Sequence, residues 1–272
     1  MTNRVLLLGI FIVLLAPLYF LITGSFQDIH GLFVMPPRLW PRNPTTVNYE
    51  WVFSLPILHW LRNTSYVFVT TVTLSVLIAT TGGYAFAFYR FPLKRFLWII
   101  ALAGIMVPRM SLIIPQFVVL RKLNLNGTLL AAILPAAYMP IGLYLARTYF
   151  ETVPKSLLES ARVDGANELQ ILAKVVAPVS RPIVTAIALF AGLQSLGDYL
   201  WQMLQLQRSD VQTMLIGLMR AVMLRGGGDG VTNINPIGRS LAVAVVLAAP
   251  MLLIFLVANR YFTTALGGAT KE

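Results

Sequence analysis

Six long apolar runs alternate with shorter polar segments along the chain. They extend over residues 5–23, 66–88, 96–120, 129–150, 183–206 and 240–257. A helix needs about 20 apolar residues to cross the hydrocarbon core of a bilayer. Backbone groups inside lipid must find hydrogen-bond partners within their own segment, so runs of this length form helices rather than strands. The pattern predicts an all-α, polytopic membrane protein with six transmembrane helices.

The first run, residues 5–23, follows Arg4 and has two interpretations, a membrane span or a signal peptide. Its apolar part is long for a signal peptide, and Ile22-Thr23-Gly24 is a poor cleavage site. We therefore expect a span that is retained.

The composition agrees with a membrane protein and not with a soluble one. The chain has 57% hydrophobic and 11% charged residues, whereas a soluble domain carries about 25% charged residues. The 21 Lys and Arg residues exceed the 10 Asp and Glu residues, and most of them lie between the apolar runs, where they meet lipid headgroups or cytoplasmic partners. No basic cluster is interleaved with aromatic residues, so we expect no nucleic-acid partner.

The sequence offers little chemistry for catalysis or metal binding. It has no cysteine, and its two histidines, His30 and His59, have no ligand spacing. The glycine-rich segment of residues 225–230 lacks the Lys-Ser/Thr of a phosphate-binding loop. We expect a flexible turn there, no catalytic residue, no cofactor, no metal and no nucleotide site, so the chain is not expected to be an enzyme.

Two loops carry expectations about placement. Residues 24–63 are rich in proline and tryptophan, which suits either an interfacial loop or a docking surface for an external partner. Six spans place both termini on one side of the membrane. The loop of residues 90–95 has three basic residues against two at Arg121-Lys122, which weakly favours cytoplasmic termini.

The polar loop of residues 151–182 has a pattern of its own. Ser156 to Glu159 and Asn167 to Gln170 have the spacing of capping boxes, which start helices. Gly165 suits the left-handed residue that ends a helix. The loop is therefore predicted to form two short helices that meet at a sharp bend, a rigid shape suited to docking in the groove of a partner.

The same loop resembles the EAA motif of ABC importer permeases. The matching residues are Glu159-Ser160-Ala161, Asp164-Gly165-Ala166, Val175 and Pro178. Ser160 and Ala177 depart from the alanine and leucine of the motif.

The resemblance covers nearly the whole chain and is to the second permease subunit of carbohydrate importers of the maltose/glycerol-phosphate type. The segments that carry it are residues 48–49, 60–64, 84–86, 90–92, 108, 114–115, 260–262 and 266–268. The family usually has a Trp-Asn pair in the fifth span, where this chain has Gly197-Asp198-Tyr199.

The resemblance implies a type I ABC importer permease fold in a bacterial or archaeal inner membrane, with both termini cytoplasmic. The expected domain is residues 1–272, with the helix core at about 63–262 and the coupling loop at 151–182. The implied partners are a sister permease in a heterodimer, two ATPase subunits, an extracytoplasmic solute-binding protein and membrane lipid. The implied function is import of a sugar or sugar-like solute. The alternatives are an importer of a non-carbohydrate solute and, in another class, a membrane scaffold without a transport role.

Candidate coupling residues follow from the motif. They are Glu159, Ser160, Ala161, Asp164, Gly165, Ala166, Leu169 and Leu172. Gly165 is expected to set the bend, Glu159 to hold it by capping and by partner contacts, and Leu169 and Leu172 to supply apolar seating in an ATPase groove.

A second set of candidates lies in the fifth run, because polar groups inside spans are costly and therefore functional by default. Gln194, Asp198 and Gln202 recur every four residues, which would place them on one helix face lining the passage or facing the sister permease. Tyr199 and Trp201 would stack on a sugar ring or anchor the interface. Arg109 either reaches the interface, pairs with Asp198 or marks a wrong span boundary.

Overall fold

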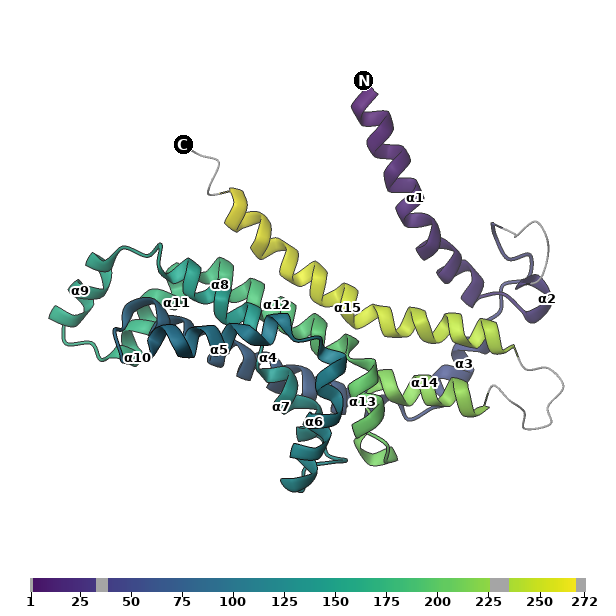
Figure 1. Ribbon diagram of the computed structural model, residues 1–272. Helices are drawn as coiled ribbons and strands as arrows, with labels where there is room; N and C mark the ends of the chain where they lie inside the picture. Colours follow the sequence, from purple (N-terminus) through teal and green to yellow (C-terminus); the bar gives the residue numbers. More distant parts are fainter. Residues whose placement is uncertain (1, 33–38, 226–234, 268–272) are drawn as a thin grey trace. The chain divides into compact units, whose positions relative to one another are not determined.

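The computed structural model describes residues 2–32, 39–225 and 235–267. The chain divides into two compact units, one of residues 1–62 and 212–252 and one of residues 63–211 and 253–272. All regular structure in the described residues is helical (Figure 1). The all-α prediction is confirmed. The glycine-rich loop of residues 225–230 falls almost wholly outside the described residues.

The first unit contains the following helices. They are α1 (Thr2–Ser25), α2 (Ile29–Leu32), α3 (Val47–Phe53), α14 (Met214–Arg225) and the first half of α15 (Pro236–Gly267). α4 (Ile57–Phe88) begins in this unit and continues into the second.

The second unit holds the remaining elements. They are α5 (Lys94–Met106), α6 (Arg109–Lys122), α7 (Leu129–Ala137), α8 (Pro140–Phe150), α9 (Lys155–Val163), α10 (Glu168–Ile171), the π-helical turn η1 (Leu172–Val176), α11 (Ala177–Val179), α12 (Arg181–Gly197), α13 (Tyr199–Gln205) and the 3-10 turn η2 (Ser209–Val211).

Each of the six apolar runs lies on helix, but three of the runs are interrupted. By length and composition, α4 and residues 236–254 of α15 can each cross a membrane unaided. The run of residues 96–120 becomes α5 and α6, which meet at 111°, and the run of residues 129–150 becomes α7 and α8, which meet at 41°. The expectation of continuous helices was wrong there.

Prolines explain two of the interruptions. Pro108 and Pro140 follow Val107 and Met139, whose backbones are extended, with ψ of 120° and 98°. A proline disfavours the helical conformation of the residue before it, so the preceding helix ends. The run of residues 183–206 breaks at Asp198 without a proline. Its φ of −79° and ψ of 64° are those of an inverse γ-turn.

The core of the first unit includes one of the tryptophans of residues 24–63. Trp60 is 5% exposed and packs with Val52, Leu218 and Val243. A Cβ on Gly217 would lie 2.3 Å from the Trp60 ring, so the ring lies directly on the backbone of α14. Trp60 is therefore a core residue of this unit.

The core of the second unit joins α4, α8 and the loop of residues 151–182. Ala79 and Tyr84 of α4 pack with Phe150 of α8 and with Leu158 and Ile171 of the loop. A Cβ on Gly83 would lie 2.7 Å from the Cβ of Ala146 and 2.9 Å from the backbone nitrogen of Arg147. Because backbone atoms cannot move aside, only glycine permits this approach of α4 to α8.

Candidate functional site

The bend in the loop of residues 151–182 is built by the local sequence. Gly165 has a φ of +81°, which costs glycine little and strains any other residue. The Gly165 N–H donates to the carbonyl of Arg162 and the Ala166 N–H to that of Ala161, each at 3.0 Å. These two bonds form a Schellman motif, which satisfies the last carbonyls of α9. The predicted role of Gly165 in ending the first helix is confirmed.

The two predicted capping boxes have different outcomes. Asn167 Oδ1 accepts from the Gln170 N–H at 2.9 Å, and Gln170 Oε1 accepts from the Asn167 N–H at 3.0 Å, so the second box is present. The first is not, because α9 begins at Lys155 and its cap position is Pro154. Ser156 therefore lies inside the first turn, and the capping role expected for Glu159 was wrong.

Apolar side chains on the loop face in two directions. Leu158, Ile171 and Leu172 are 2%, 0% and 8% exposed and belong to the core of the unit. Val163 and Leu169, on either side of Gly165, are 87% and 74% exposed. Leu169 and Leu172 were both expected to contact an ATPase groove. Leu169 is open to a partner, and Leu172 is not.

The other motif residues surround the bend. Glu159, Ser160 and Asp164 are exposed, and Ala161 and Ala166 are half-buried against the core. The exposed surface of the bend is therefore a small apolar patch, made of Val163 and Leu169, with carboxylates next to it.

A polar network ties the bend to the end of α4. Glu168 Oε2 accepts a hydrogen bond of 2.5 Å from the Tyr84 hydroxyl, and Glu168 Oε1 accepts one of 3.0 Å from Arg162 Nε. Hydrogen bonds from Arg162 and then from Tyr84 lower the pKa of Glu168 to about 2. Sequence analysis missed this network. Arg162 and Glu168 flank the bend with opposite charges and offered a signal, whereas nothing local connects Tyr84 to them.

A second polar site lies where α12 ends. Arg109 Nη2 and Asp198 Oδ2 form an ion pair of 2.9 Å, with the Arg109 side chain 59% exposed and that of Asp198 14% exposed. Arg109 is the first residue of α6, directly after the Pro108 break. Two of the proposed explanations of Arg109 are therefore correct, since it pairs with Asp198 and also marks the start of a new helix.

The break at Asp198 changes the roles of its neighbours. Gln202 is 3% exposed, and its Nε2 donates to the carbonyl of Ser195 at 2.7 Å, which satisfies an oxygen left unpaired where α12 ends. Trp201 is 4% exposed, and its Nε1 donates to the carbonyl of Ala131 in α7 at 2.8 Å. Neither side chain is open to a solute.

The prediction of one continuous polar face through Gln194, Asp198 and Gln202 was therefore wrong, because α12 and α13 are separate helices. Gln194 and Tyr199 are half-buried, and Asp198 retains part of its surface. Irregular backbone at membrane depth occurs where it is buried in protein or lines a cavity.

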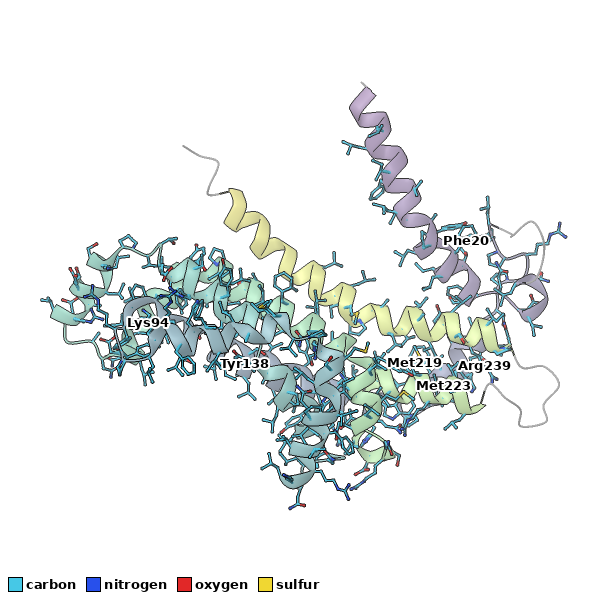
Figure 2. The ribbon with its side chains drawn as sticks, in the orientation of Figure 1. Phe20, Lys94, Tyr138, Met219, Met223 and Arg239 are labelled. Carbon is cyan, nitrogen blue, oxygen red and sulfur yellow. The ribbon has the colours of Figure 1, made fainter. Side chains whose placement is uncertain are left out.

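Other interactions brace the same region. The Tyr138 hydroxyl, labelled in Figure 2, donates to the carbonyl of Ala101 in α5 at 2.6 Å. Arg147 of α8 lies over the ring of Trp98 in α5, 4.2 Å from its centroid. These contacts fix α5 against α7 and α8 on either side of the break at Met139.

Comparison with known proteins identifies a family and several relatives of the chain. Residues 71–264 match the family described as binding-protein-dependent transport system inner membrane component. The chain is 32% identical, over 83% of its length and 79% of the relative's, to the arabinooligosaccharides transport system permease protein of Halalkalibacterium halodurans. It is 27% identical to the sn-glycerol-3-phosphate transport system permease protein of Shigella flexneri, over 99% and 96% of the two chains.

A solved structure has the same fold. It is a chain of a bacterial ABC transporter involved in the import of the acidic polysaccharide alginate. The TM-score is 0.86 at 24% identity, and the match covers 96% of each chain. The family match and the 32% identical relative show that this chain belongs to the binding-protein-dependent transport system inner membrane components, the family of such permease proteins.

Proposed function

We propose that this chain forms one half of a membrane passage for a carbohydrate, and that the bend at Gly165 receives the force of a separate ATPase. The bend carries this proposal. It is a locally determined turn that exposes Val163 and Leu169 beside the carboxylates of Glu159 and Asp164. A small apolar patch surrounded by charge suits docking in a groove of a partner.

The energy is expected to come from that partner. No phosphate-binding Gly-x-x-x-x-Gly-Lys-Ser/Thr occurs in the sequence. Movement of two ATPase subunits would displace the bends of two permeases and rock the helices, opening the passage alternately to each side. The bend then faces the cytoplasm, which puts both termini there if six spans are present. The second permease is expected to be a sister chain in a heterodimer.

The break at Asp198 is the proposed place where the chain meets its solute. Broken helices in transporters expose polar groups near the middle of the membrane. Asp198, Tyr199 and Gln194 retain exposed surface there. At the same break, the Gln202 side chain donates a hydrogen bond to the carbonyl of Ser195 and so stabilises the end of α12. Arabinooligosaccharides and sn-glycerol-3-phosphate, carried by the relatives, supply the class of solute to test.

The decisive experiment compares two glycines. Gly165 and Gly127 have φ of +81° and +75°, and a Cβ on either would touch nothing within 4 Å. Alanine therefore imposes a similar backbone strain of about 1–2 kcal/mol at both positions, but only Gly165 lies in the coupling bend. In proteoliposomes of the whole transporter, we expect G165A to lower uptake strongly and G127A to lower it little.

Charge reversal tests the partner contact directly. We expect E159K to reduce copurification of the ATPase and to abolish uptake, with the permease still present in the membrane. Uptake would be measured for arabinooligosaccharides, alginate oligosaccharides and sn-glycerol-3-phosphate. Methionine would be the non-carbohydrate solute for comparison. Normal uptake by both G165A and E159K would refute the coupling role, and uptake of methionine alone would refute the carbohydrate assignment.

A further inference from the structure

The network at the bend joins three elements through one carboxylate. Tyr84 belongs to the last turns of α4, Arg162 to α9 and Glu168 to α10. In Figure 1, α9 and α10 lie at the end of the second unit where α5 begins. Glu168 Oε1 accepts from Arg162 Nε, and Glu168 Oε2 accepts from the Tyr84 hydroxyl and, at 3.5 Å, from Arg162 Nη2. The carboxylate therefore links α9 and α10 to each other and to α4.

The burial of the three groups shows which bond matters most. Tyr84 is 5% exposed, whereas the side chains of Arg162 and Glu168 are 45% and 41% exposed. An ion pair this exposed contributes little by itself. The bond from a buried hydroxyl to a carboxylate is charge-assisted and is less screened by water. Tyr84 therefore provides the fixed end of the link.

Apolar contacts alone do not fix the direction of so small a segment. α9 has nine residues and α10 has four, and contacts between apolar side chains are non-directional. The hydrogen bonds of Glu168 have defined geometry and lie on the side of the bend next to α4. They restrict rotation of the bend that the apolar contacts of Leu158 and Ile171 would permit.

We propose that Tyr84, Arg162 and Glu168 form a clamp that holds the coupling bend in one orientation on the end of α4, so that displacement of the bend moves α4. This proposal rests on the function proposed above for the bend. The three are positioning residues, since they are argued to act through the docking surface of Val163 and Leu169. The clamp thus governs how much solute is moved for each ATP hydrolysed, while the bend itself governs binding of the ATPase.

The first measurement is the ratio of solute imported to ATP hydrolysed, in proteoliposomes of the whole transporter with its binding protein. We expect Y84F and E168A to lower this ratio about three- to tenfold, with the ATPase still copurifying. Y144F is the matched control, because Tyr144 stacks on Trp98 and its hydroxyl has no side-chain hydrogen bond in the described part of the chain. E168Q keeps an oxygen that can accept from the Tyr84 hydroxyl, so it should recover part of the ratio lost in E168A.

The second measurement reports the orientation of the bend. The chain has no cysteine, so S156C in α9 and R90C can carry two spin labels without background and away from the docking surface. Both positions are exposed. We expect a narrow distance distribution in the otherwise unaltered permease and in Y144F, and a broader one in Y84F and E168A. A role confined to folding stability would lower the melting temperature without broadening this distribution or changing the ratio.

The outcomes separate the two proposals. If Y84F and E168A leave both the ratio and the distance distribution unchanged, the clamp is refuted, even if G165A still blocks uptake. If G165A and E159K both transport normally, the coupling role of the bend is refuted and the clamp with it. Broadening together with a lowered ratio, without loss of the ATPase, supports the clamp.

Discussion

Helical structure is interrupted at Gly165 and at Asp198, and the two interruptions are built in different ways. At Gly165 the hydrogen bonds that shape the turn come from residues within five positions along the chain. At Asp198 the ion-pair partner, Arg109, is 89 residues away. A turn made by near neighbours keeps its shape when helices shift, whereas a break held by a distant helix responds to that helix. The first suits transmission of force and the second suits opening of a passage.

The strongest way to break this comparison is to destroy the local turn. Proline fixes φ near −65°, so G165P is incompatible with the φ of +81° at this position and removes the bond to Arg162. We expect uptake to fall to background while the permease remains in the membrane. Uptake and membrane content would be measured together. Transport near the normal rate would show that the turn need not be rigid.

The corresponding change at the other break is Q202L. It removes the partner of the Ser195 carbonyl, and a buried polar group left unpaired costs about 1–3 kcal/mol. We expect a lower melting temperature in detergent and reduced uptake. Q116L is the matched control, because the side chain of Gln116 in α6 is half-buried and makes no hydrogen bond in the described part of the chain. Equal melting temperatures for the two variants would contradict the bracing role of Gln202.

A smaller effect is expected from the ion pair at the break. The Arg109 side chain is more than half exposed, so the pair is worth about 0.2–1 kcal/mol. We expect R109A and D198A to change the melting temperature little and to change the apparent KM for the solute more than the turnover. A double-mutant cycle of uptake on R109A, D198A and the double variant measures the coupling. Strictly additive effects would show that the pair has no part in the passage.

The smallest effect is expected from a change of pH, because Glu168 stays ionised across the range tested. The pKa of Glu168 is lowered to about 2, so the stabilising contribution of the ionised form is complete above about pH 4.5 and is lost as the pH falls through about 2. We expect the distance between labels at S156C and R90C to be the same at pH 8 and pH 5. A change between these values would show that Glu168 does not hold the bend in its ionised form.

The two interruptions also show what sequence can predict. Gly165 and the Asn167–Gln170 box were predicted, because their partners are close along the chain and the residue types are specific. The same reasoning failed for Ser156, since the spacing of a capping box does not reveal that Pro154 already occupies the cap position.

The break at Asp198 was not predicted, because Gly197-Asp198-Tyr199 lies inside an apolar run and has no proline. The buried roles of Trp201 and Gln202 depend on Ala131 in another helix and on the break itself. Periodicity assumes a continuous helix, so it placed Gln194, Asp198 and Gln202 on one face. Tyr84 and Glu168 are 84 residues apart along the chain, so only the structure reveals their hydrogen bond.

The close approach at Gly83 has a mechanical consequence. Because Gly83 has no side chain, the backbone of α4 lies close to the Cβ of Ala146 and to the backbone nitrogen of Arg147 in α8. Arg147 of α8 in turn covers Trp98 of α5. We therefore expect α4, α8 and α5 to move together, so that a force received at one end of α4 is shared by helices that do not touch its source.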